Sequence, residues 1–211
     1  MRARTLYFSR SGNSLRAAIA VELAGLPVEK IRLDMAAGDN RTPAFLGLNA
    51  SGTVPAYLER LADGEELVLT QSAAIADHLL QPTRPELYPN DPVERARVQS
   101  SVYAAISDLA MQNSLMRYLS FSEDSVRFLQ ERFLRMLAAA FEGLKTQPWV
   151  CGARMTIADV AHYPAVHMRR AQLEAIGCYP HVLDWAARMR EQEAVARAIA
   201  YAGLELSAQG E

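Results

Sequence analysis

Apolar and polar residues in the N-terminal part of the chain follow two periods, one of two residues and one close to 3.6. Short β-type runs alternate with stretches in which apolar residues recur every three or four positions, such as Leu15, Ile19 and Leu23. Glycine and proline residues such as Gly25 and Pro27 mark the ends of these runs. The expected elements are strands at 5–9, 28–34, 55–58 and 66–70 and helices at 15–25, 43–48 and 72–80.

The second half of the chain shows a helical pattern only. Helices are expected at 93–118, 125–146, 157–171 and 181–200. The stretch before them carries prolines at 82, 85, 89 and 92 and little apolar periodicity, which indicates a linker. The order of the first half, β-α-β-α-β-β-α, is typical of a thioredoxin-like α/β domain. We therefore expect a thioredoxin-like domain at 1–81, a proline-rich linker at 82–92 and an all-α helical domain at 93–211.

Composition narrows the class of protein. Of the 211 residues 50% are hydrophobic and 22% are charged, so the chain can bury a core. The 22 basic and 24 acidic residues give a net charge of −2 without a long run of one sign, so neither nucleic acid nor a membrane surface is expected as a partner. No apolar run of about 18 residues suggests a membrane span. Cys151 and Cys178 form no paired motif, as expected for reduced thiols of a cytoplasmic protein.

Two features that resemble chemical sites are expected to have other roles. The four histidines show no spacing typical of metal ligands, so no metal site is predicted. Thr156-Ile-Ala-Asp159 has the form of a capping box, in which each side chain bonds to a backbone N–H at the start of a helix. We interpret it as a structural element.

Two short strings, Asn49–Pro55 and Leu69–Ile75, point to a binding site. Val54-Pro55 lies at the start of an expected strand, where proline is tolerated because its missing N–H is not needed there. Ser72 follows another strand and opens a helix, where backbone N–H groups and a hydroxyl can hold a carboxylate. Together they predict a socket for a small peptide with a free carboxylate.

Further motifs connect this socket to a known family. The motif segments are Ser11-Gly-Asn-Ser-Leu-Arg16, Asn49-x-x-Gly-x-Val-Pro55, Gln71-Ser72-x-Ala-Ile75, Thr156-Ile-Ala-Asp159 and Tyr179-Pro180-His181. In this order and at these spacings they resemble the cytosolic glutathione S-transferase family over essentially the whole chain. The resemblance implies glutathione as co-substrate, a helical C-terminal domain that carries the electrophile site, and a cytoplasmic homodimer engaged in detoxification.

The resemblance also assigns roles to residues of the N-terminal half. The backbone of Val54 is expected to pair with the cysteinyl unit of glutathione, and Gln71 and Ser72 are expected to hold its γ-glutamyl end. Asn40 and Arg41 fall near the glycyl carboxylate, which a guanidinium matches better than an amide. A solvated loop charge is the alternative interpretation of Arg41. The implied glutathione-binding residues are Asn40, Arg41, Val54, Pro55, Gln71 and Ser72.

A transferase of this kind must hold glutathione as a thiolate, because the thiolate is the nucleophile. Lowering a thiol pKa from about 8.5 by two units takes roughly 2.7 kcal/mol. A hydroxyl that donates to a charged acceptor supplies about 1.5–3 kcal/mol, and a helix N-terminus adds about 0.3–1 kcal/mol. A hydroxyl at the start of the first helix is therefore sufficient for the task.

Two hydroxyls compete for this role. Ser11 resembles the serine that precedes the first helix in serine-type classes, and it is the preferred catalytic residue, with a plain N-cap serine as the alternative. Tyr7 ends the first strand, as the catalytic tyrosine does in the alpha, mu and pi classes, and its alternative role is in the core or a cleft wall. Asn13 stands where beta-class enzymes carry a cysteine, so thiol-disulfide exchange of the beta type is disfavoured.

We expect a glutathione S-transferase that conjugates glutathione to a small hydrophobic electrophile. Tyr103, Met111 and Leu115 are candidates for the electrophile pocket, and a packing role is their alternative. Two further functions stay open. One is a glutathione-dependent dehalogenase or isomerase of the maleylacetoacetate or maleylpyruvate type, although Gly12 and Asn13 interrupt the Ser-Ser-Cys signature of zeta-class isomerases. The other is a non-catalytic binding protein of the same fold.

Overall fold

The structure, a computed structural model, describes residues 3–118 and 122–205 and divides into two compact units. The first unit joins Met1–Pro85 to Gln192–Glu211, and the second comprises Glu86–Glu191. Among the described residues, every helix falls short of the length or the apolarity that a membrane span requires.

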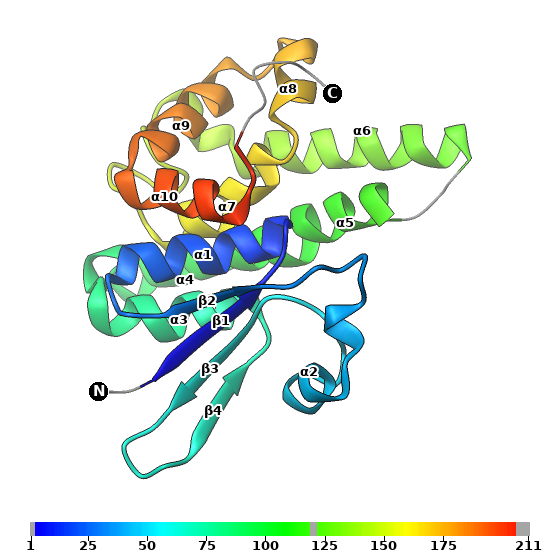
Figure 1. Cartoon of the computed structure of the whole chain (residues 1–211). Helices are drawn as coiled ribbons and strands as arrows, with labels where there is room; N and C mark the ends of the chain where they lie inside the picture. Colours follow the sequence, from blue (N-terminus) through cyan, green and yellow to red (C-terminus); the bar gives the residue numbers. More distant parts are fainter. Residues whose placement is uncertain (1–2, 119–121, 206–211) are drawn as a thin grey trace. The chain divides into compact units, whose positions relative to one another are not determined.

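The first unit is built on a four-stranded sheet in the order β2-β1-β3-β4 (Figure 1). β1 pairs in parallel with β2 and antiparallel with β3, and β3 pairs antiparallel with β4. Side chains alternate between the two faces of a strand, so Leu6 and Phe8 are buried on one face while Tyr7 lies on the other. The strands are β1 (Arg4–Phe8), β2 (Glu29–Arg32), β3 (Ala56–Arg60) and β4 (Glu66–Leu69).

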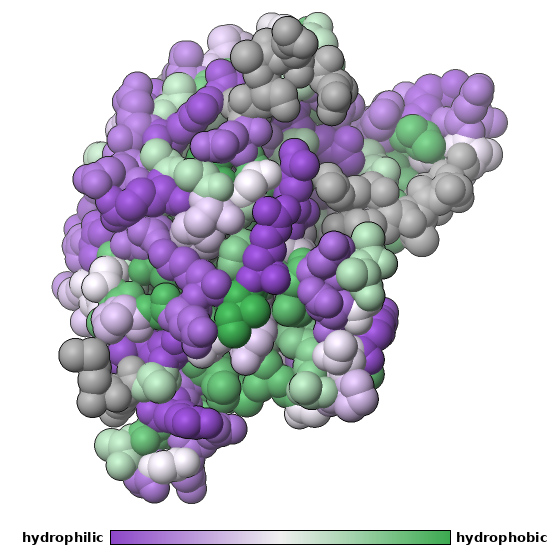
Figure 2. All heavy atoms as spheres, viewed as in Figure 1, coloured by the Kyte–Doolittle hydropathy of each residue, from purple (hydrophilic) through white to green (hydrophobic). Residues whose placement is uncertain are grey.

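The helix α1 is buried along most of its length because it packs against both α3 and α10. Ser11 caps its first turn, and Gly25 ends it with a φ of 64°, a left-handed conformation that glycine adopts easily. Polar residues cover much of the face seen in Figure 2, with apolar residues gathered between the β3–β4 hairpin and α2. The helices of this unit are α1 (Gly12–Ala24), the 3-10 helix η1 (Asp39–Arg41), α2 (Pro43–Leu48), α3 (Ser72–Thr83) and α10 (Glu193–Ala202).

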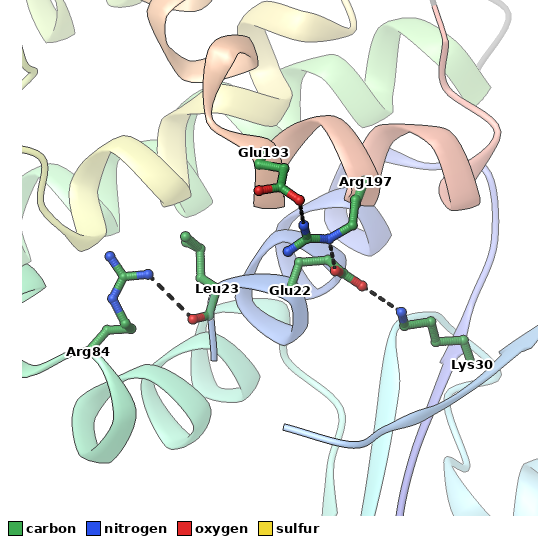
Figure 3. Close-up of polar contacts among 6 residues, drawn as sticks. All are labelled: Glu22, Leu23, Lys30, Arg84, Glu193 and Arg197. Carbon is green, nitrogen blue, oxygen red and sulfur yellow. Dashed lines mark hydrogen bonds and ion pairs between the residues drawn. The ribbon is translucent and has the colours of Figure 1, made fainter. Parts of the chain in front are cut away.

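The helix α10 is joined to the sheet unit by ion pairs. The Glu22 carboxylate of α1 lies between Lys30 and Arg197, and Arg197 also pairs with Glu193 (Figure 3). Burial alone would raise the pKa of Glu22, but the hydrogen bonds from the two cations outweigh it and hold this pKa below its usual value. The C-terminal helix therefore contributes to the stability of the unit that carries the sheet.

The second unit is helical, and a buried carboxylate organises its centre. Asp159 Oδ2 accepts from the Thr156 N–H at 2.8 Å, and Oδ1 accepts from the Val150 N–H at 3.0 Å and from Trp185 Nε1 at 2.9 Å. The predicted capping box is thus confirmed. The helices are α4 (Pro92–Tyr103), η3 (Ala104–Ala110), α5 (Met111–Tyr118), α6 (Glu123–Ala140), η4 (Glu142–Lys145), α7 (Ile157–His167), α8 (Arg170–Ile176) and α9 (Pro180–Glu191), and the 3-10 helix η2 (Pro85–Leu87) lies at the junction of the units.

The fold class expected from the sequence, a thioredoxin-like unit and a helical unit, is confirmed, while several element boundaries differ. α3 continues to Thr83 with Pro82 in its last turn, so the helix runs into the predicted linker. The helix expected at 93–118 winds as a π-helix over Ala104–Ala110, a change of hydrogen bonding that apolar periodicity does not reveal. The domain boundaries themselves stay a prediction, to which the structure adds the packing of α10 on α1.

Candidate functional site

Ser11 occupies the N-cap of α1, a helix of 13 residues. Its Oγ accepts a hydrogen bond from the Ser14 N–H at 3.2 Å and donates to Ser14 Oγ at 3.0 Å. Ser14 is fully buried and also accepts from the Ser9 N–H. The Ser11 hydroxyl lies at the positive end of the helix dipole. Because Ser11 is only half-buried, it remains partly accessible to solvent.

Tyr7 lies on the other side of the β1–α1 turn. Its ring is half-buried and packs edge-on against Phe45 of α2, with the ring centroids 5.8 Å apart. The contact with Phe45 fits the alternative role of a wall residue. Because Tyr7 and Ser11 flank the same turn, position alone does not choose between them, and the choice stays a prediction.

Ser72 is the first residue of α3 and is 6% exposed. Its Oγ accepts a hydrogen bond from Nη1 of Arg16 at 2.8 Å, and the same nitrogen donates to Oδ1 of Asn13 at 2.9 Å. Gln71 precedes Ser72 as an exposed N-cap whose side chain makes no capping bond. The start of α1 and the start of α3 are thus joined by one guanidinium.

The loop before β3 carries the backbone expected to meet a peptide ligand. Asn49 Nδ2 donates to the Thr53 carbonyl at 2.8 Å and so closes the loop on itself. The Val54–Pro55 peptide bond is cis. The β1–β3 ladder begins at Ala56, and no described residue forms a backbone hydrogen bond with Val54. The N–H and C=O of Val54 are therefore open to an extended ligand.

Asn40 and Arg41 use their side chains differently. Asn40 is 5% exposed, and its Nδ2 donates to the Gly52 carbonyl at 2.6 Å, which fixes the loop. Arg41 is exposed, and its guanidinium lies against Gly52, where an added Cβ would stand 2.8 Å from Nη1. Gly52 also has a φ of 62°, so a side chain is disfavoured there twice over. The assignment of Arg41 to the glycyl carboxylate stays a prediction.

The residues predicted for the electrophile pocket lie on the second unit. Tyr103 on α4 is 67% exposed and Met111 on α5 is 54% exposed, while Leu115 is half-buried. The π-helical segment η3 separates the first two. Their assignment to the pocket stays a prediction. In the part of the chain that the structure describes, no group of three or more His, Cys, Asp or Glu side chains is arranged for a metal ion.

Sequence reasoning missed the contact made by Arg16. In the sequence Arg16 served only as a motif position, between Leu15 and a run of alanines. Its side chain is 1% exposed, and burial lowers its pKa to about 10, which leaves it charged at neutral pH. The signal in the sequence is the arginine itself. A charged residue in an otherwise apolar stretch of a helix is buried only where it has hydrogen-bonding partners, so a buried Arg16 implies such partners.

Two protein-family models match most of the chain. Residues 3–81 match the glutathione S-transferase N-terminal domain, and residues 102–193 match the glutathione S-transferase C-terminal domain. The chain belongs to the glutathione S-transferase family. The family resemblance inferred from the sequence motifs is therefore confirmed.

Glutathione S-transferase relatives of this chain carry several different names. A maleylacetoacetate isomerase of Pseudomonas aeruginosa is 30% identical over 191 residues, which cover 86% of this chain and 87% of the relative. Disulfide-bond oxidoreductase YfcG of Escherichia coli is 27% identical, covering 94% and 95%. A theta class glutathione S-transferase of Xanthomonas axonopodis pv. citri, solved with glutathione bound, is 28% identical with a TM-score of 0.77, covering 94% and 98%. Family membership thus leaves the reaction to be argued from the site.

Proposed function

We propose that this chain is a glutathione S-transferase that holds the sulfur of glutathione as a thiolate with Ser11 and joins it to a small electrophile. The observation that carries the proposal is the half-buried Ser11 hydroxyl at the N-cap of α1. The same unit contains the open backbone of Val54 and the Ser72 hydroxyl at the start of α3. A relative solved with glutathione bound supports the choice of ligand.

The proposed chemistry needs no general base in the protein. Glutathione loses its thiol proton to solvent on binding, and the Ser11 O–H donates to the resulting thiolate. The thiolate then attacks the electrophilic carbon, so that a carbon–sulfur bond forms and, with an aryl halide, the carbon–halogen bond breaks with release of halide. Arg41 binds the glycyl carboxylate, Val54 pairs with the cysteinyl unit, and Gln71 and Ser72 hold the γ-glutamyl end.

Calorimetry with glutathione, followed by turnover of an aryl halide, tests the proposal. Binding together with conjugation supports it. Binding without turnover of any electrophile assigns the chain to the non-catalytic alternative. If glutathione does not bind at all, the roles carried over to Ser11, Val54 and Ser72 are wrong.

The isomerase alternative is kept because of the 30% identity to a maleylacetoacetate isomerase. An isomerase releases glutathione unchanged after each turnover, whereas a conjugating transferase consumes it. Incubation with maleylacetoacetate and a small amount of glutathione separates the two reactions. Product in excess over glutathione assigns the isomerase.

The assembly and location implied by the family belong to the same proposal. We propose a cytoplasmic homodimer, with Tyr103, Met111 and Leu115 contacting the electrophile. Light scattering on the purified protein measures the oligomeric state directly. A monomeric mass with full activity would remove the dimer from the proposal.

A further inference from the structure

Arg16 is a buried charged residue that the proposed chemistry does not use. It lies on α1 and is 1% exposed, yet its Nη1 reaches Ser72, which is 56 positions away in the sequence. Burying a charge is costly unless hydrogen bonds compensate for the lost water. We therefore expect the hydrogen bonds of the Arg16 guanidinium to orient the groups that it contacts.

The bond from Arg16 decides what the Ser72 hydroxyl can do. A serine hydroxyl has one hydrogen to donate and two lone pairs to accept with. Because Arg16 Nη1 donates to Ser72 Oγ at 2.8 Å, a lone pair is occupied and the O–H remains to be donated. A positive charge next to the oxygen also polarises the hydroxyl and strengthens its bond to an anion.

The second bond of Arg16 links Ser72 to the turn that carries Ser11. Nη1 donates to Asn13 Oδ1 at 2.9 Å, and Asn13 is the second residue of α1, two positions after the N-cap Ser11. Asn13 is exposed whereas Arg16 is buried, so the guanidinium reaches from the interior of the unit to the surface at the start of α1. One nitrogen thereby couples the segment proposed to hold sulfur to the segment proposed to hold the γ-glutamyl unit.

We propose that Arg16 is a positioning residue for glutathione, which turns the Ser72 O–H toward the γ-glutamyl carboxylate and fixes α3 against the first turn of α1. The inference rests on the proposed function and concerns the same site. Arg16 acts through Ser72 and does not touch the ligand itself. Its effect on glutathione affinity therefore disappears when the Ser72 hydroxyl is absent.

A double-mutant cycle with S-methylglutathione as the probe tests this. The probe keeps the γ-glutamyl carboxylate but has no thiol, so the chemistry at Ser11 does not enter. Ser72→Ala is expected to weaken binding about tenfold or more, the value of a hydrogen bond to a charged group. Arg16→Lys keeps the charge but loses the planar donor geometry, and is expected to weaken binding several-fold alone and less than about twofold in the Ser72→Ala background.

Asn13→Ala provides a second cycle if Arg16→Lys does not fold, because Asn13 is exposed. It releases one side of the guanidinium, and its expected loss of about two- to threefold in affinity should likewise vanish in the Ser72→Ala background. Arg197→Lys is the control, because Arg197 lies in the same unit and forms ion pairs with Glu22 and Glu193. This substitution should leave the affinity for S-methylglutathione unchanged.

The outcomes separate this inference from the proposed function. If wild-type protein does not bind S-methylglutathione, the proposed function fails and the role of Arg16 fails with it. If wild type binds and the effects of Arg16→Lys or Asn13→Ala multiply with that of Ser72→Ala, only the positioning role is overturned. Loss of the Arg16 effect in the absence of the Ser72 hydroxyl supports it.

Discussion

Replacing Ser11 by alanine removes the hydroxyl proposed to stabilise the thiolate. In the free protein this hydroxyl donates to Ser14 Oγ at 3.0 Å, and on binding it would donate to sulfur instead. A hydrogen bond to a charged acceptor contributes about 1.5–3 kcal/mol, which corresponds to about 1–2 pKa units. The pKa of bound glutathione in Ser11→Ala should therefore rise by about 1–2 units toward that of a free thiol, about 8.5.

The same substitution also removes a helix cap, and this effect needs its own control. Loss of an N-cap serine costs about 1 kcal/mol of stability in any helix. The chain offers a matched case at α6, where Ser122 Oγ accepts from the Ser125 N–H at 3.4 Å and lies 3.0 Å from Ser125 Oγ. Ser122→Ala should lose comparable stability while the pKa of bound glutathione stays unchanged.

The assay is the ultraviolet absorbance of the thiolate as a function of pH, with protein saturated by glutathione. The pH dependence of kcat/KM for an aryl halide provides a second measure, since activity of Ser11→Ala should fall about 10- to 100-fold at neutral pH and recover at higher pH. An unchanged thiolate midpoint in Ser11→Ala would refute the assignment. A shifted midpoint in Tyr7→Phe alone would transfer the role to Tyr7.

Three further substitutions have definite expected outcomes. Gly52→Ala forces a Cβ against Arg41 at a φ of 62°, so KM for glutathione should rise several-fold with kcat unchanged, whereas Gly47→Ala, with open space around it, should leave KM unaltered. Glu22→Gln should lower Tm by a few degrees at pH 7. Because folding lowers the pKa of Glu22, its contribution is present above the unfolded pKa and lost as pH falls through the folded value, so the difference in Tm between mutant and wild type should shrink as melts are repeated at pH values below the unfolded pKa of about 4.3. Asp159→Asn turns amide hydrogens toward N–H donors and should destabilise the helical unit by about 3 kcal/mol or more in urea titrations.

Local signals in the sequence were sufficient for most of the fold. Ser11 and Gly25 mark the two ends of α1 because capping and a left-handed residue are local requirements. The capping box at Thr156–Asp159 was predicted for the same reason, since both of its bonds close within a single turn. Helix ends that are fixed by residues only a few positions away can therefore be predicted from the sequence.

Features set by distant contacts could not be predicted in this way. The apolar face of α10 shows that the helix packs on something, but the pattern does not say that its partner is α1. The buried residues Val102, Ala105 and Leu109 keep helical spacing through the π-helical turn at Ala104–Ala110, so periodicity alone predicts an ordinary helix. Both results depend on surfaces that meet only after folding.

The serines at the starts of α1 and α6 show that a local sequence pattern is also insufficient to predict function. Both follow a Ser-x-x-Ser pattern, and in both the first Oγ caps the helix and lies 3.0 Å from the second. Capping accounts for the local pattern in both helices, so the proposal for Ser11 depends on what differs between them. Ser11 is half-buried whereas Ser122 is exposed, and the buried Arg16 connects the first turn of α1 to Ser72 across 56 positions. If Ser11→Ala and Ser122→Ala behave alike in the thiolate titration, Ser11 is a helix cap and nothing more, whereas the connection made by Arg16 is tested separately by the affinity for S-methylglutathione.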